Sequence, residues 1–216
     1  MHDERRNFLL AMTGLLAVPK LALSNQLLST PSQTAGPFYP VDLPLDNDND
    51  LTRIANRTEQ AKGDITDLAG RVVDINGNAI PNARIEIWQC DYNGRYRHPY
   101  EKGKNPIDAN FQGHGFTKTN ANGQYFFRTI KPVAYPGRTP HIHIAVFPPG
   151  EQPFVTQLYV KGEPENKTDF LFNHLPEDRK HLVLADFVRV EEKSISYQAT
   201  FDIILDRDSG TPMDIS

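Results

Sequence analysis

The stretch Arg138-Thr139-Pro140-His141-Ile142-His143-Ile144-Ala145-Val146-Phe147 decides the fold. Successive side chains of a β-strand point to opposite faces. His141 and His143 therefore share one face, while Ile142 and Ile144 point into the opposite layer. This stretch predicts a strand with an apolar face on one side and two imidazoles on the other.

Segments of similar character lie on both sides and are separated by turn residues. Residues 70–75 and 83–89 flank Asn76-Gly77, and residues 115–119 and 124–129 flank 120–123. Each pair predicts a β-hairpin with a tight turn. Roughly eight strands without helices between them predict an all-β protein, an antiparallel β-sandwich with long loops. The other predicted strands cover 141–147, 154–160, 183–190 and 195–205, with loop expected in 162–182 and one helical turn after Pro176.

Composition supports one folded domain and excludes several classes of protein. The chain has 216 residues, and 23 Lys+Arg against 27 Asp+Glu give a net charge of −4, which argues against a nucleic-acid binder. Seventeen Pro and 14 Gly punctuate short strands. The single cysteine, Cys90, allows no intramolecular disulfide and no thiolate-rich zinc site.

The N-terminal residues 1–25 have the features of an export signal. Arg5-Arg6 precedes an apolar run from residue 8 to 18, and small residues follow at 22–24. This pattern predicts a twin-arginine signal and an exported, periplasmic protein, with no membrane segment in the mature form. The twin-arginine route carries folded proteins, which favours a cofactor. Residues 26–62 read as an extended N-terminal arm and loops, and 63–216 as the β-sandwich catalytic domain.

The polar residues near the histidine pair suggest a metal site. His-x-His supplies two nitrogen ligands, although an exposed strand face explains the motif equally well. The positions that a His/Glu site would fill with glutamate hold Val146 and Phe147. Two tyrosines, Tyr96 and Tyr135, precede the pair. Phenolate is a hard anionic donor, so two phenols and two imidazoles suit ferric iron.

Three separated blocks, 88–98, 127–136 and 138–143, resemble the intradiol ring-cleavage dioxygenases, most closely the protocatechuate 3,4-dioxygenases. The resemblance runs from about Thr30 to Leu205. It implies one non-haem Fe(III) per chain and an active-site arginine beside bound catechol. By the resemblance, the ligands are Tyr96, Tyr135, His141 and His143, Arg138 and Tyr135 are catalytic, and Gly36, Pro37, Gln157 and Arg138 contact the substrate.

The same resemblance implies the reaction. O2 is inserted between the two hydroxylated carbons of a catechol-type, protocatechuate-like aromatic to give a cis,cis-muconate-type diacid, without an external reductant. The connection from Tyr135 to His141 is shorter than in well-known relatives, which leaves the catechol unspecified. A homo-oligomer stays open, as does the question of whether the arm 31–37 covers its own site or that of a neighbour.

Two other readings compete with the enzyme. The Gly70–Asp74 opening and the Asn122–Phe127 hairpin also resemble prealbumin-like modules, so a non-catalytic binding module of the immunoglobulin/prealbumin-like type is the main alternative. A zinc hydrolase is weaker, because tyrosine is an unusual zinc ligand and no general-base glutamate lies beside the histidines.

Overall fold

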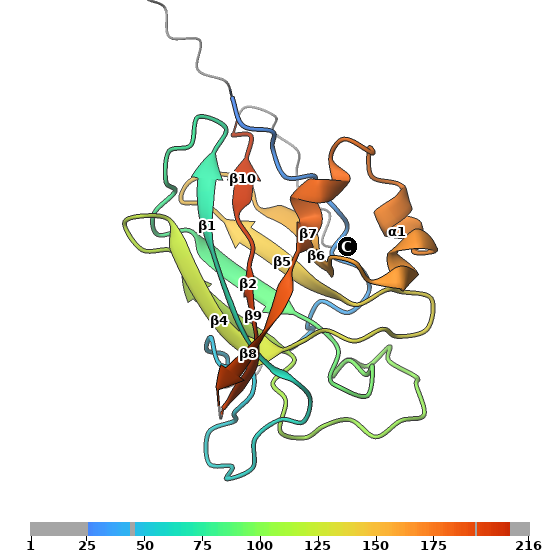
Figure 1. Cartoon of the computed structure of the whole chain (residues 1–216). Coiled ribbons are helices and arrows are strands. Elements are labelled where there is room, and N and C mark those ends of the chain that lie inside the picture. The colour runs from blue at the N-terminus through green and yellow to red at the C-terminus, as the bar shows by residue number, and fades with distance from the viewer. Residues whose placement is uncertain (1–25, 44–45, 193, 208–216) are drawn as a thin grey trace, which may run out of the picture.

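The structure, a computed structural model, describes residues 26–43, 46–192 and 194–207, and most of its regular elements are strands (Figure 1). The predicted export signal lies outside the described residues. In the part of the chain that is described, no helix has the length and apolar character needed to span a bilayer. The elements are β1 (Ile65–Asp74), β2 (Arg84–Trp88), β3 (His114–Lys118), β4 (Gln124–Ile130), β5 (His141–Phe147), β6 (Phe154–Val160), the 3-10 helix η1 (Pro164–Lys167), α1 (Phe170–Asn173), the 3-10 helix η2 (Lys180–Val183), β7 (Leu184–Ala185), β8 (Phe187–Glu192), β9 (Ile195–Thr200) and β10 (Ile203–Leu205).

The strands form two five-stranded sheets, both of mixed direction. One has the order β10-β1-β9-β8, with β4 also paired to β1, and the other has the order β3-β2-β5-β6-β7. The all-β prediction is confirmed, but the purely antiparallel one is wrong, because β1 pairs in parallel with β9 and β10, and β6 with β7. A parallel return needs a long crossover, and the excursion through η1, α1 and η2 provides one between β6 and β7.

The first predicted hairpin is wrong, although its turn is real. Gly77, with φ of 83°, donates its amide to Asp74 O at 2.9 Å. Beyond the turn the chain pairs back only at one bridge, between Val73 and Ala79. Pro81 and Asn82 then redirect the chain, and Asn82 takes a positive φ of 58°. As a result, β2 joins β3 and β5 in the other sheet and leaves β1 behind.

The second predicted hairpin is wrong in the same way. The turn at 120–123 forms, with Gly123 N–H donating to Asn120 O at 2.9 Å, yet β3 pairs with β2 while β4 pairs with β1. A tight turn reverses the chain without choosing its neighbour. The pairing partner of a strand is determined by where its apolar face can be buried.

Buried side chains lie on both faces of the β2–β5–β6 sheet. The main cluster takes Leu68 and Val72 from β1 and Ile142 and Ile144 from β5, so both sheets contribute to it. A second cluster lies on the opposite face, and residues of the arm pack into it. Its buried members are Ala35, Trp88, Cys90, Tyr96, Ala145 and Val155. The histidine face of β5 is therefore a second, covered interior.

Candidate active site

The register of the sheet puts the histidines in two rows of polar and aromatic residues. His143 lies between Trp88 of β2 and Gln157 of β6, and His141 lies opposite Tyr159 of β6. The indole of Trp88 stacks on the His143 imidazole at 4.9 Å and 5°. Both histidines are 1% exposed. Burial on a strand with neighbours on both sides fixes the two rings rigidly.

The two imidazoles turn the same nitrogen toward each other. Nε2 of His141 lies 3.2 Å from Nε2 of His143. Nδ1 of His141 lies 2.6 Å from the carbonyl oxygen of Thr139, which can only accept, so Nδ1 carries the proton and Nε2 is left with a lone pair. Two nitrogen ligands of one ion, each about 2.1 Å from it, lie roughly 3 Å apart, so the observed spacing fits shared coordination.

Tyr96 is brought to the histidines by a turn in the loop after β2. The Asp91 carboxylate accepts from the amides of Asn93 (2.8 Å) and Arg95 (3.0 Å) and thereby shapes this turn. Gly94 has a φ of +73°, and a Cβ there would lie 3.0 Å from the Ala134 carbonyl. Only glycine lets this loop pass so close to the segment that carries Tyr135, and the tyrosines meet as a result.

A two-residue turn joins Tyr135 to Arg138. Their backbones exchange hydrogen bonds, from Arg138 N to Tyr135 O at 2.9 Å and from Tyr135 N to Arg138 O at 3.3 Å. Pro136 and Gly137 form the turn, with φ of +84° at Gly137. This is the chemistry of a turn with proline first and glycine second. The turn brings the phenol and the guanidinium to the same side.

The four residues that the resemblance names as ligands gather in one place. Ring centroids are 5.4 Å apart for Tyr96–Tyr135, 5.5 Å for Tyr135–His141, 4.8 Å for His141–His143 and 6.3 Å for His143–Tyr96, which closes a circuit. The Tyr96 hydroxyl is buried and has no hydrogen-bond partner among the described residues. A buried polar atom without a partner is costly, so its presence points to a ligand.

Burial dominates the electrostatics of this group. It lowers the pKa of His141 to about 3, with the Arg138 charge as a second cause, and lowers the pKa of His143 well below its usual value. Both rings are therefore neutral near pH 7, which is the form that binds metals. Burial also raises the pKa of the Tyr96 and Tyr135 phenols. A bound cation would oppose that effect and favour the phenolates.

The arm covers the site of its own chain in this structure. A Cβ placed on Gly36, where φ is +70°, would lie 3.3 Å from Cε1 of His143. Pro37 follows and is exposed, and the ring of Phe38 stacks on Tyr96 at 4.5 Å. A backbone bond from Gln33 N to Val155 O, at 2.8 Å, holds the arm to β6, and the Thr156 hydroxyl adds a bond to Pro31 O at 2.9 Å.

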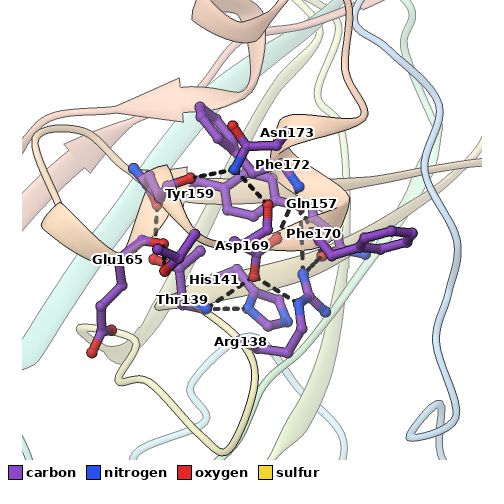
Figure 2. Close-up of polar contacts among 12 residues, drawn as sticks. Arg138, Thr139, His141, Gln157, Tyr159, Glu165, Asp169, Phe170, Phe172 and Asn173 are labelled. Carbon is purple, nitrogen blue, oxygen red and sulfur yellow. Dashed lines mark hydrogen bonds and ion pairs between the residues drawn. The ribbon is translucent and has the colours of Figure 1, made fainter.

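Arg138 and Gln157, which the resemblance expects to contact the same substrate, are in contact with each other. Arg138 donates to Oε1 of Gln157 at 2.6 Å, and the Tyr159 hydroxyl donates to the same oxygen at 3.1 Å (Figure 2). The Gln157 Nε2 donates to Thr34 O at 3.0 Å. Gln157 is fully buried with both ends of its amide engaged, so its direct contact with substrate stays a prediction.

A hollow of about 480 Å³ reaches the site along one edge. It is lined by residues 134–139 together with Glu165, Thr168 and Asp169. Tyr135 and Arg138 are partly exposed, whereas Tyr96, His141 and His143 are buried. A small molecule entering the hollow therefore meets Tyr135 and Arg138 first.

Sequence reasoning missed several polar residues of the site. Asp169 binds Arg138, and Gln33 of the arm donates to the Tyr159 hydroxyl at 2.8 Å. These residues lie far from the histidine pair in sequence, and no motif surrounds them. A usable signal for Asp169 was its place before the short apolar stretch that begins at Phe170, which is typical of a helix N-cap.

The donor set and its surroundings fit a non-haem ferric ion. Two oxygen and two nitrogen donors converge, one phenol lacks a partner, and the imidazole Nε2 atoms are spaced as adjacent ligands. Within the described residues, no group of three or more side chains drawn from His, Cys, Asp and Glu is placed to hold a metal ion. The group seen here contains only two such side chains, together with two tyrosines.

The fold and site define a protein of two β-sheets in which two tyrosines and two histidines lie close together in the interior, and comparison with known proteins gives its family. The protein family described as "Dioxygenase" matches residues 34–207. The protocatechuate 3,4-dioxygenase beta chain of Burkholderia cepacia is 36% identical over 180 residues, covering 77% of this chain and 75% of the relative. The hydroxyquinol 1,2-dioxygenase of Corynebacterium glutamicum is 32% identical, covering 76% of this chain and 58% of the relative.

Solved structures are similar over most of the chain. The dioxygenase domain of a dioxygenase carbohydrate-binding protein fusion from Streptomyces sp. SirexAA-E has a TM-score of 0.62 and 30% identity, covering 82% of this chain and 98% of that one. Catechol 1,2-dioxygenase from Acinetobacter sp. ADP1, at 24% identity and a TM-score of 0.63, supports the fold alone. The chain belongs to the intradiol ring-cleavage dioxygenases and is an enzyme of that class.

Proposed function

We propose that this protein is a non-haem Fe(III)-dependent dioxygenase that cleaves a catechol-type aromatic between its two hydroxylated carbons, with O2 as co-substrate and a muconate-type diacid as product. Tyr96, Tyr135, His141 and His143 would hold the ion. The bound ferric ion would supply a Lewis acid that binds the substrate oxygens and accepts electron density from the ring.

One observation carries this proposal. Two phenols and two neutral imidazoles converge inside a protein interior, and the buried Tyr96 hydroxyl lacks a partner among the described residues. Two phenolates reduce the charge of a trivalent ion to +1, and a hydroxide would remove the remainder. Near-neutrality is what makes such an ion tolerable away from water.

The chain's own residues divide the remaining work. Tyr135 lies at the edge of the hollow, so its phenolate oxygen would be placed to accept a proton from the arriving catechol. Arg138 is always cationic and would stabilise negative charge that develops on the ring. Gly36 and Pro37 of the arm would cover the site beside His143, and Gln157 would hold the Arg138 guanidinium in place.

The finer features of the fold and location are part of this proposal. The two sheets share one buried cluster, which supports reading them as the layers of a β-sandwich. We further propose that residues 1–25 direct export by the twin-arginine route to the periplasm, which a fusion of these residues to a reporter would test. In this proposal the shape of the hollow determines which catechol binds, and the short turn from Tyr135 to Arg138 forms part of its wall.

The test uses the full chain loaded with iron. Tyrosinate bound to Fe(III) absorbs visible light, so the protein should be reddish, and its band should shift when catechol is added without oxygen. Oxygen uptake with catechol, hydroxyquinol and protocatechuate, followed by product mass, then reports ring cleavage. Tyr96→Phe should weaken and shift the band while keeping the fold, because Tyr135 remains as the second tyrosinate ligand. A colourless wild type without iron and without ring-opened product would favour the non-catalytic binding module.

A further inference from the structure

Asp169 is a buried carboxylate whose contacts lead to the candidate site and to the helix beside it. Its side chain is 0% exposed. Oδ2 accepts from Arg138 Nε at 2.9 Å and from the Thr139 amide at 3.0 Å. Oδ1 accepts from the Phe172 amide at 2.8 Å and so caps α1 (Figure 2). One side chain therefore ties the helix to the segment that leads into β5.

Arg138 is held from two directions. Asp169 binds its Nε, and Gln157 of β6 accepts from another nitrogen of the same guanidinium. Two acceptors on different sides fix the plane of the group as well as its place. The Arg138 side chain is 14% exposed. Without Asp169, a largely buried cation would lose its ion pair and would be free to swing toward the hollow.

Thr139 connects Asp169 to His141. Its amide donates to Asp169, its hydroxyl donates to Oδ1 of Asn166 at 2.8 Å, and its carbonyl accepts from Nδ1 of His141 at 2.6 Å. Because Thr139 is held at its amide and at its side chain, the direction of its carbonyl is set. That carbonyl in turn sets which nitrogen of His141 faces His143.

Hydrogen bonding keeps Asp169 in the charged form that these contacts need. Burial alone would raise the pKa of this carboxyl, but donation from the amides of Phe172 and Thr139 and from the Arg138 guanidinium lowers it below its usual value. The carboxylate is thus an anion with several donors around it. An anion so placed is a rigid anchor for a neighbouring cation.

We propose that Asp169 is a positioning residue of this active site: it sets the Arg138 guanidinium against the hollow and, through Thr139, the orientation of His141. This inference rests on the proposed function. A purely structural role would be the capping of α1. The two roles are separable, because capping uses one oxygen, which serine also supplies, whereas Arg138 and Thr139 use the other.

The test compares Asp169→Ser and Asp169→Asn in the full, iron-loaded chain. Asp169→Ser keeps a capping hydroxyl but loses the contacts to Arg138 and Thr139. We expect kcat/KM for catechol to fall roughly 10- to 100-fold, with part of the loss recovered in Asp169→Asn, which keeps the shape without the charge. The affinity for catechol in the absence of oxygen, measured from the shift of the visible band, should also be lower in Asp169→Ser than in the wild type. If the serine variant does not fold, the asparagine variant decides the question by the same measurements.

A double-mutant cycle with Arg138→Gln shows whether Asp169 acts through the arginine. If it does, adding Asp169→Ser to Arg138→Gln costs much less than adding it to the wild type. The effect of Asp169 on His141 is measured separately, as the affinity of the protein for iron in competition with a chelator. Equal losses in both backgrounds with unchanged iron affinity, or full activity in Asp169→Ser, would overturn the positioning role.

Asp74 provides the matched control. It is also a buried aspartate that accepts backbone amides, those of Asn76 (2.8 Å) and Asn78 (2.9 Å), but it lies at the turn after β1. Asp74→Ser should lower the melting temperature without changing kcat/KM. If the iron-loaded wild type fails to cleave any catechol, the proposed function is refuted. The positioning role is then decided by iron affinity alone, and equal values for wild type and Asp169→Ser would refute it too.

Discussion

Replacement of Gly36 by alanine tests whether the arm controls the site that it covers. Gly36 has a φ of +70°, and its added Cβ would lie 3.3 Å from Cε1 of His143, closer than an ordinary van der Waals contact. The left-handed conformation costs an alanine about 1–2 kcal/mol. The contact adds to this cost unless the arm or the imidazole moves by a few tenths of an ångström. The arm cannot move freely, because one backbone bond and the side chains of Thr156 and Gln157 hold it to β6.

The size of the effect follows from that strain. A loss of about 1–2 kcal/mol corresponds to a fall in melting temperature of roughly 2–8 °C for a domain of this length. If the strain is relieved at the site, the same free energy lowers kcat/KM for catechol by about 5- to 30-fold. Movement of the His143 ring should also shift the visible band of the iron-loaded protein, since that ring is a proposed ligand.

Gly150→Ala is the control for this experiment. Gly150 has a φ of +75°, but no atom lies within 4 Å of its added Cβ. It therefore carries the same backbone cost without the contact at the site. Melting curves should show a loss for both variants, at least as large for Gly36→Ala as for Gly150→Ala, while only Gly36→Ala should lose activity and shift the band. Equal kcat/KM values in Gly36→Ala and Gly150→Ala would refute the claim that the arm acts on the site.

Three further predictions concern the metal and the fold. Removal of iron with a chelator should abolish the colour and the oxygen uptake with catechol, and Fe(III) but not Zn²⁺ should restore both. Gly70→Ala should leave little folded protein in a circular dichroism spectrum, since its Cβ would lie 1.8 Å from the Phe201 carbonyl oxygen. Glu86, buried beside His114 and Tyr39, loses solvation, but its hydrogen bonds lower its pKa below 4.5. The charged Glu86 therefore stabilises the fold above about pH 4.5, and this stabilisation is lost as the pH falls below that value. Glu86→Gln should have a lower melting temperature than the wild type at pH 7 and the same melting temperature in acid.

Local pattern was sufficient to predict where most strands form, but not which strands pair. The predicted strands 183–190 and 195–205 are each divided in the structure, into β7 and β8 and into β9 and β10. The predicted strands at 141–147 and 154–160 coincide with β5 and β6, because alternation and turn residues act over a few positions. Both predicted hairpins failed, since their turns cross from one sheet to the other. The parallel pairing of β1 with β9 joins Leu68 to Ala199, and no local signal records so distant a partner.

The sequence by itself determined the chemistry that the site offers. The period of a strand puts His141 and His143 on one face, and Pro136-Gly137 makes the turn that joins Tyr135 to Arg138. Both features arise within a few residues, so the printed chain is enough to see them. The resemblance to a dioxygenase family rests on the same short blocks, and the comparisons confirm it.

Only the tertiary structure decided what stands around those residues. It brought Tyr96 against the histidines, laid the arm over His143, and put Asp169 behind Arg138. Each of these contacts spans dozens of residues or more. The physical reason is that contacts between distant residues depend on how whole sheets and loops pack to bury their apolar faces. Backbone geometry, which can be predicted from the sequence, acts only between residues close together in the chain.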